Sequence, residues 1–402
     1  MIKFENGQKK IPFYWELFIN QIHKNWHVGT LEIEITGHGT TILEGKYESD
    51  KPQFAHLKIN NFRAIRRILF SGDIGLFEGY KNNDWETKDL YALLNIISSN
   101  LDGISKIQNN APLKTTINLA LHWLRPNSKK GSRKNIYSHY DIGNSFFEKW
   151  LDKSMTYSAG IFDKSEDLES AQLRKYEEIA KSVDLKSGDN VLEIGCGWGG
   201  FATYAAQYIG ANVTCVTISQ AQHDHTLELI KSRGLEDRIS LKLLDYRDID
   251  GQYDAIVSIE MFEAVGEAYW PIYFAKLQSL LKPNGKAGLQ IITIRDDLFD
   301  DYRNNTDFIQ NYIFPGGMLP SIEKLHEFAK AHNFTSYIRR NFGFDYYKTL
   351  IEWGKRFENA WHEGKIIGFD MNFKKLWDFY LAYCAAGFKS QRTDVVHLVL
   401  SK

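Results

Sequence analysis

The sequence predicts an α/β protein: a doubly wound, mostly parallel sheet together with a smaller N-terminal α+β domain. A length of 402 residues allows two or three domains. From about residue 190 onward, short apolar runs alternate with helix-like segments, and a glycine-rich turn follows the first of these runs. Alternation of this kind is typical of parallel strands in one sheet whose two faces are covered by helices.

Residues 1–105 have the pattern of the small α+β domain. Between residues 29 and 37 apolar and acidic side chains alternate, which predicts a strand with one buried face. Further extended segments are predicted at Thr40–Gly45 and Phe54–Phe62. This domain contains no constellation of residues that predicts catalysis.

Residues 106–136 are predicted to form a basic linker that includes a helix. No acidic residue occurs between Gly103 and Tyr140, and the basic residues there are Lys106, Lys114, Arg125, Lys129, Lys130, Arg133 and Lys134. One interpretation is a solvated linker between domains. The other is a surface in which Ala111–Leu124 and its basic flank dock on anionic lipid headgroups.

Residues 137–402 are predicted to form the larger, catalytic domain. The strands expected in it are Asn190–Gly195, Asn212–Ile218, Ile239–Asp245, Tyr253–Glu260 and Ala287–Ile294. The helices expected between them are Phe201–Ile209, Ser219–Arg233 and Ala268–Leu281. Glycines or a Pro-Asn-Gly turn follow these helices, as helix ends require.

The composition of the chain limits the functions that it can have. The formal net charge of −1, from 49 basic and 50 acidic residues, gives no basic footprint for a nucleic acid. Three cysteines exclude a disulfide scaffold and favour a reducing compartment, so a cytoplasmic location is expected. His223 and His225 lack further ligand spacing, and no metal site is predicted.

The glycine-rich turn lies in Val191–Gly200. Glycine allows tight turns and close approach of a ligand to the backbone. A phosphate-binding loop would continue with Lys-Ser or Lys-Thr, which is absent. A dinucleotide site would place an acid at the end of the next strand, where Thr217–Gln220 has none. Glu193 suits the ammonium group of S-adenosylmethionine (AdoMet) and Asp245 its adenine, although Glu193 could also be a structural carboxylate that binds loop amides.

From about Tyr137 to Lys402 the chain resembles the cyclopropane fatty acid synthase family of AdoMet-dependent methyltransferases, which includes the mycolic acid cyclopropane synthases. The matching motifs are Ser138–Phe147, Met155–Ser158, Val191–Gly200, Thr217–Gln222, Ser258–Gly266, Tyr312–Pro320 and Cys384–Phe388. The N-terminal third looks like the extra domain of the phospholipid-acting members. The resemblance implies the Rossmann-like fold of class I AdoMet-dependent methyltransferases.

The resemblance also implies which residues contact AdoMet. These residues, together with Glu193 from the argument above, are Tyr157, Ser158, Gly195, Gly197, Thr217, Ile218, Gln222, Asp245 and Tyr246. Gln222 has a second interpretation, because Ser219 and Gln222 have the spacing of a capping box at a helix start.

Members of the family hold a bicarbonate ion beside the transferred methyl group. Glu263 and Tyr346 match the Glu and Tyr of its cage, and Cys384 matches a second cysteine near it. Ala159 and Ile292 stand where the family has a Cys and a His ligand. Because about half of the polar cage is missing, the sequence leaves bicarbonate binding open.

The implied reaction adds a one-carbon unit to the cis double bond of an unsaturated phospholipid chain. Aromatic faces could stabilise the resulting carbocation, and the candidates are Tyr140, Tyr157, Phe262, Tyr312 and Tyr346, with core packing as the alternative for each. Glu263, or an ion that it holds, is the candidate base, whereas Glu260 is interpreted as a carboxylate at a helix start. The product is a cyclopropane or a methyl(ene)-branched chain, and the missing Cys and His favour the open chain.

Two other functions remain open. Plant alkaloid N-methyltransferases share the Glu-Met-Phe-Glu pattern but continue with His, where Ala264 stands, so an amine is the alternative substrate. A lipid-binding module without catalysis is the second alternative. For the phospholipid reaction we expect peripheral contact with the inner face of the membrane. The sequence leaves open a homodimer and a separate reductase partner.

Overall fold

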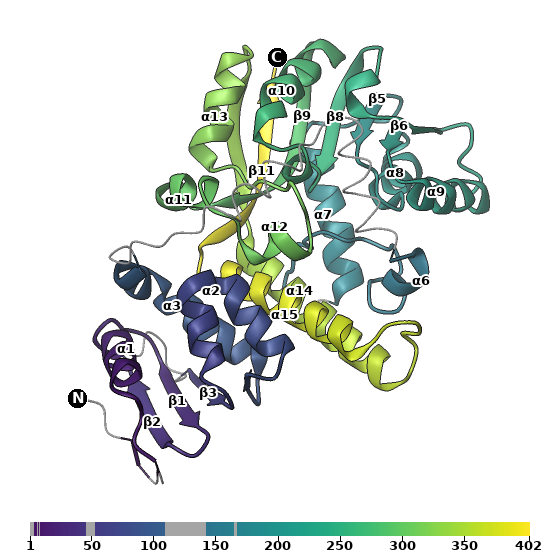
Figure 1. The fold of residues 1–402 in the computed structure, drawn as a ribbon. Coiled ribbons are helices and arrows are strands. Elements are labelled where there is room, and N and C mark those ends of the chain that lie inside the picture. The colour runs from purple at the N-terminus through teal and green to yellow at the C-terminus, as the bar shows by residue number, and fades with distance from the viewer. Residues whose placement is uncertain (1–3, 6, 8, 46–52, 109–141, 165–166) are drawn as a thin grey trace. The chain divides into compact units, whose positions relative to one another are not determined.

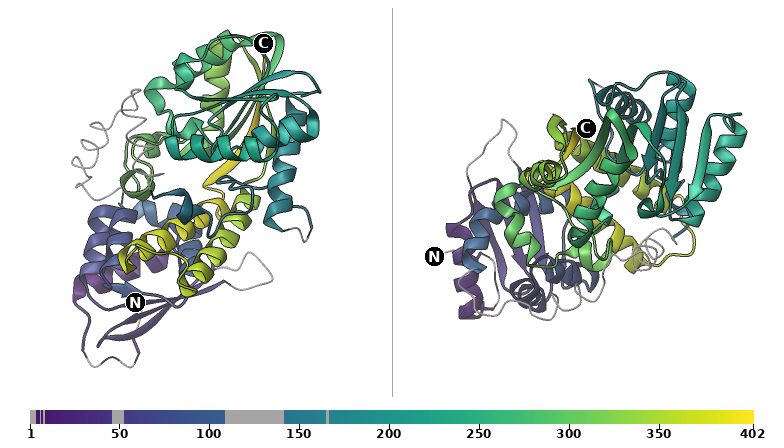
Figure 2. Two further views of the ribbon diagram at one scale, coloured as in Figure 1. Left: turned by 90° about the vertical axis from the view of Figure 1, so that its right-hand side faces the viewer. Right: turned by 90° about the horizontal axis from the view of Figure 1, so that it is seen from above.

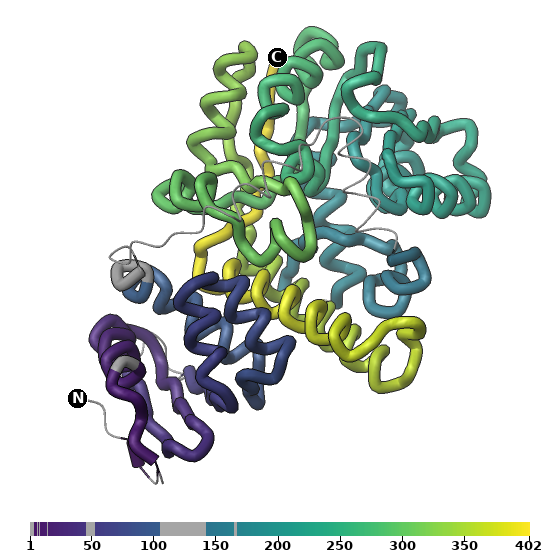
Figure 3. Tube along the Cα trace, in the orientation of Figure 1, coloured from purple at the N-terminus to yellow at the C-terminus, as the bar shows by residue number. Residues whose placement is uncertain are grey.

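The computed structural model describes residues 4–5, 7, 9–45, 53–108, 142–164 and 167–402. These residues form two compact units (Figure 1). The smaller unit takes its residues from Met1–Ala120 and Gly368–Ser390, and the larger from Leu121–Ile367 and Gln391–Lys402. The course of the chain within each unit can be followed in Figure 3.

The smaller unit is built on a four-stranded sheet in the order β2-β1-β3-β4. Its elements are α1 (Phe13–Lys24), β1 (Thr30–Ile35), β2 (Gly39–Glu44), β3 (Phe54–Ile59), α2 (Arg63–Lys81), β4 (Trp85–Glu86), α3 (Leu90–Gln108) and α15 (Met371–Lys389). Strand β1 runs antiparallel to β2 and parallel to β3. Its side chains alternate between buried and half-buried, which confirms the strand predicted from the alternation.

Helix α15 differs from the predicted division of the chain. The sequence interpretation placed everything from residue 137 to 402 in the catalytic domain, but α15 packs on α3 and α2 and belongs to the smaller unit. The apolar face of a helix does not reveal which sheet or helix it covers. The sequence of α15 therefore could not show that this helix belongs to the smaller unit. Helix α3 also continues to Gln108, past the predicted boundary at residue 105.

The basic linker predicted at 106–136 lies almost entirely outside the described residues, as do Tyr140 and the start of the Ser138–Phe147 motif. The lipid-docking interpretation of that segment therefore stays a prediction. None of the helices that the structure describes is long and apolar enough to cross a membrane.

The larger unit contains a seven-stranded sheet in the order β10-β11-β9-β8-β5-β6-β7. Its strands are β5 (Asn190–Ile194), β6 (Asn212–Thr217), β7 (Ile239–Leu243), β8 (Tyr253–Ile259), β9 (Leu281–Ile294), β10 (Thr335–Asn341) and β11 (Thr393–Ser401). Strands β5 to β9 pair in parallel, whereas β11 is antiparallel to both β9 and β10. The predicted doubly wound, mostly parallel sheet is confirmed.

Helices cover both faces of this sheet, as the left view of Figure 2 shows. The helical elements are α6 (Asn144–Phe147), α7 (Leu168–Ser182), α8 (Gly200–Tyr204), η1 (Ala205–Ile209), α9 (Gln220–Ser232), η2 (Tyr246–Asp248), η3 (Phe262–Ala264), η4 (Glu267–Tyr269), α10 (Trp270–Leu280), η5 (Asp296–Leu298), α11 (Phe299–Arg303), α12 (Phe308–Tyr312), α13 (Ile322–Ala331) and α14 (Gly343–His362). One core packs α10 and α13 on the sheet, and the other packs α7, α8 and α9.

The five strands predicted from Asn190 to Ile294 all form, and so do the three helices predicted between them, with ends that differ by a few residues. Strand β9 is the exception in length, because it begins at Leu281 and includes the Pro-Asn-Gly segment that the sequence assigned to a turn.

Candidate active site

The glycine turn lies at the point where the strand order reverses. Strand β5 pairs with β6 on one side and β8 on the other, and ligands of open α/β sheets bind beyond the carboxyl ends of such strands. Gly195 has φ +82°, and a Cβ there would lie 2.6 Å from Cγ of Met261. Gly197 has φ +52°, and a Cβ there would meet no atom within 4 Å. Gly195 therefore packs against the protein, whereas Gly197 faces open space.

Glu193 is the last residue but one of β5 and is buried. The backbone amide of Ala202 in α8 donates to the Glu193 carboxyl group. Glu193 therefore acts in part as a structural carboxylate that binds a backbone amide, which was the alternative interpretation. Among the residues that the structure describes, its Oε2 has no hydrogen-bond partner. Burial raises the pKa of Glu193 to about 8, against the opposing charge of Lys175. An orphaned, buried carboxylate oxygen beside an open glycine turn fits the ammonium group of AdoMet.

Thr217 and Gln222 meet after β6. Oγ1 of Thr217 donates to Oε1 of Gln222 at 2.8 Å, and both residues are buried. Ser219 caps α9 by accepting from the backbone N–H of Gln222. The side chain of Gln222 thus accepts a hydrogen bond from Thr217. Of the predicted capping box, the bond from the backbone N–H of Gln222 to the Ser219 side chain is present. Ile218, between these residues, is half-buried.

Asp245 follows β7 and is buried. Its two carboxylate oxygens accept from Nε and Nη2 of Arg247 at 2.8 and 2.7 Å. Oδ1 also accepts from the backbone N–H of Arg247 at 3.0 Å, so Arg247 holds this carboxylate at the carboxyl end of β7. Tyr246 is buried beside it, its ring 5.3 Å from the Arg247 guanidinium carbon, and burial raises the pKa of its phenol to about 12.

Lys175 is a residue that the sequence interpretation missed. It is fully buried on α7, and its Nζ donates to Oγ of Ser158 at 2.6 Å. Burial lowers its pKa to about 7, opposed by the charges of Glu260, Asp152 and Glu193. Helical periodicity could have found it, because it shares a spacing of three and four residues with buried Ala171 and Gln172.

Aromatic rings form a continuous wall from the glycine turn to α14. The ring centroid of Tyr157 lies 5.3 Å from that of Phe147 and 5.2 Å from that of Trp353. Phe147 also contacts Trp198 of the glycine turn at 5.1 Å. Trp353 in turn meets the ring of Tyr346 edge-on at 6.1 Å. We call these five residues the aromatic wall.

Glu260 follows β8, and its carboxyl group accepts three hydrogen bonds. Its Oε1 accepts from the backbone N–H of Ala159 at 2.8 Å and from Nε2 of Gln290 at 2.7 Å. Its Oε2 accepts from the hydroxyl of Tyr346 at 2.7 Å. The interpretation of Glu260 as a helix-start carboxylate is wrong, because the following short helix η3 begins two residues later and three donors from distant segments bind it.

Glu263 lies in η3, and its Oε1 accepts from the backbone N–H of Ile292. Its Oε2 is buried and has no hydrogen-bond partner within the described part of the chain. Burial, followed by the nearby charge of Glu260, raises the pKa of Glu263 to about 8. With a pKa of about 8, Glu263 holds a proton near neutral pH. Burial raises the pKa of Glu260 as well, but hydrogen bonds from Tyr346, Ala159 and Gln290 oppose that rise.

The remaining predicted residues are less closely tied to this cluster. Phe262 is 1% exposed among Trp270, Tyr273 and Phe274, and so it packs the core. Tyr312 is 37% exposed on α12. Cys384 is a half-buried residue of α15, in the smaller unit, and Tyr140 lies outside the described residues.

The arrangement does not fit a bicarbonate ion as it fits AdoMet. Ala159 and Tyr346 mark two positions of the family's cage, and both donate to Glu260 of the chain itself. At the family's His position, Ile292 offers only a backbone N–H, which donates to Glu263. The donors expected to hold the ion are thus already used by carboxylates.

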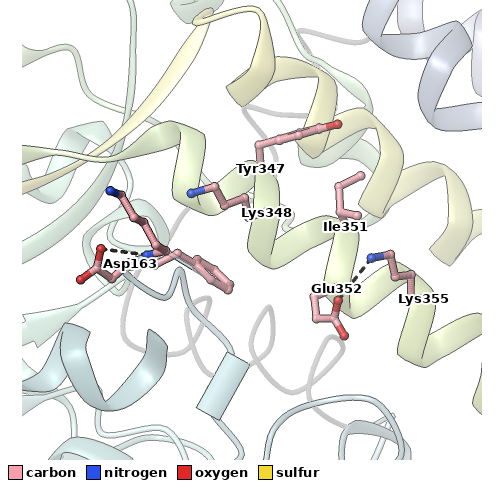
Figure 4. A pocket seen from close by; sticks show the side chains of 8 residues that line it. Asp163, Tyr347, Lys348, Ile351, Glu352 and Lys355 are labelled. Carbon is pink, nitrogen blue, oxygen red and sulfur yellow. Dashed lines mark hydrogen bonds and ion pairs between the residues drawn. The ribbon is translucent and has the colours of Figure 1, made fainter. Parts of the chain in front are cut away.

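A surface pocket of the larger unit lies away from these residues. Figure 4 shows Tyr347, Lys348, Ile351, Glu352 and Lys355 projecting from α14, with Asp163 across from them. Glu352 pairs with Lys355 at 3.5 Å, and Lys348 pairs with Asp345 at 2.9 Å. No predicted site residue lines this pocket, so it is not the proposed methyl-transfer site.

Several known proteins are similar to this chain in sequence. The family described as mycolic acid cyclopropane synthetase matches residues 127–398. Tuberculostearic acid methyltransferase UfaA1 of Mycobacterium tuberculosis is 35% identical over 83% of this chain and 80% of its own length. Cyclopropane-fatty-acyl-phospholipid synthase of Escherichia coli K12 is 35% identical over 87% of this chain and 88% of its own.

Solved structures show the same fold. The cyclopropane synthase MmaA2 from M. tuberculosis matches 67% of this chain and 98% of its own with a TM-score of 0.62 and 28% identity. CmaA1, solved with SAH and CTAB, matches equally well. Coclaurine N-methyltransferase, at 18% identity and a TM-score of 0.58, shares the fold.

The strand order and the glycine turn define a class I AdoMet-dependent methyltransferase with a Rossmann-like sheet. Within that class, the chain belongs to the cyclopropane fatty acid synthase family. It is an AdoMet-dependent C-methyltransferase.

Proposed function

We propose that this enzyme transfers a one-carbon unit from AdoMet to the cis double bond of an unsaturated phospholipid acyl chain. The observation that carries the proposal is the aromatic wall, which runs from Trp198 of the glycine turn to Tyr346 beside Glu260. The phospholipid synthase of E. coli aligns with 87% of the chain, whereas MmaA2 aligns with 67%, which favours a phospholipid over a mycolic acid.

When bound, AdoMet supplies the electrophilic methyl group, and we propose that Glu193 and the open face at Gly197 hold it. An alkene is a weak nucleophile, so exact positioning against the methyl provides much of the rate. The aromatic wall attracts the carbocation that forms on the chain and, unlike water, does not add to it. A carboxylate then accepts a proton, from the new methyl group if a ring closes or from a neighbouring chain carbon if it stays open.

Membrane contact follows from the substrate, because the double bond lies within the hydrocarbon core of a bilayer. Peripheral association with the inner face of the membrane is part of the proposal. The basic segment around 106–136 is its proposed contact, and the homodimer and the reductase stay predictions.

The test is incubation of the protein with methyl-labelled AdoMet and vesicles of monounsaturated phospholipid, with saturated vesicles as the control. We expect label in the unsaturated phospholipid alone. Label that partitions into water-soluble amines would favour the amine N-methyltransferase, and no turnover with any vesicle would favour a lipid-binding module.

Proton NMR of the product identifies its chemistry. Ring and methylene-branched chains are isomers, so mass alone does not separate them. The missing Cys and His of the family cage favour the open chain, for which we expect no upfield ring-methylene signals. Such signals in the product would instead establish ring closure and overturn the open-chain expectation.

A further inference from the structure

The segments around Glu260 are arranged as a cage for an anion. The N–H of Ala159, the side-chain amide of Gln290 and the hydroxyl of Tyr346 converge from three distant parts of the chain, and each donates to the same carboxylate. A cage of such donors stabilises one negative charge. In this protein the group inside the cage is the side-chain carboxyl of Glu260.

The donors are themselves held in place. Nε2 of His397 lies 3.0 Å from Oε1 of Gln290, and because an amide oxygen only accepts, the histidine donates. His397 and Gln290 are both fully buried, so this bond orients the Gln290 amide toward Glu260. The hydroxyl of Thr349 accepts from the N–H of Gly160, which fixes the segment next to Ala159 on α14.

The backbone of Glu260 also bears strain. Its φ is +48°, a left-handed conformation that glutamate adopts at a cost of about 1 kcal/mol or more. Such strain persists where the surrounding structure enforces it, and it is concentrated at functional sites. Here it directs the carboxylate into the cage formed by Ala159, Gln290 and Tyr346.

We propose that the carboxylate of Glu260 takes the place of the bicarbonate ion, so that the enzyme binds no bicarbonate and uses Glu260 as its proton acceptor. This inference rests on the proposed function. In the step, a C–H bond of the cationic chain breaks and its electron pair forms the new C–C or C=C bond. The proton passes to a Glu260 oxygen, which becomes a carboxylic acid and later releases the proton to water.

The first test measures methyl transfer from AdoMet into monounsaturated phospholipid vesicles in buffer freed of carbon dioxide, with and without added bicarbonate. We expect wild-type turnover to be the same in both buffers. Wild-type turnover that falls when bicarbonate is removed and recovers when it is restored would overturn the inference.

The second test uses Glu260→Gly, which removes the carboxylate, opens the cage and relieves the strained φ. We expect turnover to fall by about 100-fold or more, as for loss of a general base, and to recover in part when bicarbonate or formate is added. Chloride should not restore it. The exposed residue Glu236 provides the matched control, Glu236→Gln, which should behave as wild type. Full activity of Glu260→Gly without any added anion would contradict the proposal.

A binding measurement separates this inference from the proposed function. Titration of wild-type protein into ¹³C-bicarbonate should leave the NMR line unbroadened, and Glu260→Gly should broaden it. This measurement requires neither turnover nor a stable variant. If wild-type protein broadens the ¹³C-bicarbonate line, that result is enough to overturn the inference. If wild type labels no phospholipid in either buffer, it is the proposed function that fails.

Discussion

The two halves of the candidate active site are built in different ways. The centre of the cofactor half comes from one continuous stretch, in which β5 leads into the glycine turn and α8, and further candidate residues follow the neighbouring strands β6 and β7. The carboxylate half is assembled from segments around residues 159, 260, 290 and 346, which come together only in the folded larger unit. The first half therefore depends on local backbone geometry, and the second depends on long-range packing.

This difference teaches where function diverges within one fold. The glycine turn with its orphaned carboxylate oxygen at Glu193 suits AdoMet whatever the acceptor is. The acceptor chemistry depends on the two carboxyl groups at the other end of the aromatic wall, where Glu260 receives three hydrogen bonds and Oε2 of Glu263 has no partner among the described residues. Variants that separate the two halves test this division.

Among the variants that keep both carboxyl groups, the largest effect is expected from Tyr346→Phe. It removes the O–H donated to Glu260 Oε2 at 2.7 Å and keeps the ring against Trp353. A hydrogen bond to a charged group is worth about 1.5–3 kcal/mol, so kcat should fall by roughly 10- to 100-fold. The affinity for S-adenosylhomocysteine should stay the same, as measured by calorimetry.

The same variant has a predicted pH signature. Burial raises the pKa of Glu260, and the hydrogen bond from Tyr346 opposes that rise. Loss of the bond should therefore raise the pKa further, and the acid limb of the kcat profile should move to higher pH. The groups that face Glu260 are Lys175, which also lowers its pKa, and Glu263, and neither is changed. An acid limb that stays in place would mean that Glu260 does not titrate in the reaction.

The next effect concerns two glycines of one turn. Gly195→Ala combines a left-handed φ with a Cβ 2.6 Å from Met261, whereas Gly197→Ala brings the strained φ alone. The strain costs about 1–2 kcal/mol and the overlap about 1–3 kcal/mol more. Because 1 kcal/mol shifts the Tm of a domain this size by about 2–4 °C, Gly195→Ala should melt clearly lower than Gly197→Ala.

In a binding assay that is corrected for the fraction of folded protein, Gly197→Ala should be the more strongly affected of the two variants, although Gly195→Ala is the less stable. Gly197→Ala places a methyl group in the open space where AdoMet is proposed to lie, so it should weaken S-adenosylhomocysteine binding more. Equal affinities for both folded variants would contradict that placement.

The smallest effect is expected from Glu263→Gln and concerns stability. The pKa of this carboxyl in the folded protein, about 8, lies above its ordinary value of 4.5, so the folded state keeps a proton that the unfolded chain has lost. That contribution is complete below about pH 4.5 and disappears as the pH rises through 8. The Tm of Glu263→Gln should therefore gain on wild type between pH 6 and pH 9. A constant difference across this range would mean that Glu263 is ionised throughout.

The strand, the glycine turn and the capped helix of the cofactor half could be predicted, because each leaves a local signal in the sequence. That these residues bind AdoMet stays a prediction. The sequence also predicted Glu263 and Tyr346 as parts of the site, and the structure places Glu260 between Tyr346 and Ala159. No spacing rule indicates that residues 100 positions apart share one carboxylate. Lys175 could have been found from helical periodicity, whereas the packing of α15 in the smaller unit could not.

The most direct measurement compares turnover of Glu260→Gln and Glu263→Gln with wild type, side by side, in buffer freed of carbon dioxide. The account predicts a loss of about 100-fold or more for Glu260→Gln and a loss within about tenfold for Glu263→Gln. The reverse order, with Glu263→Gln nearly inactive and Glu260→Gln close to wild type, would contradict it.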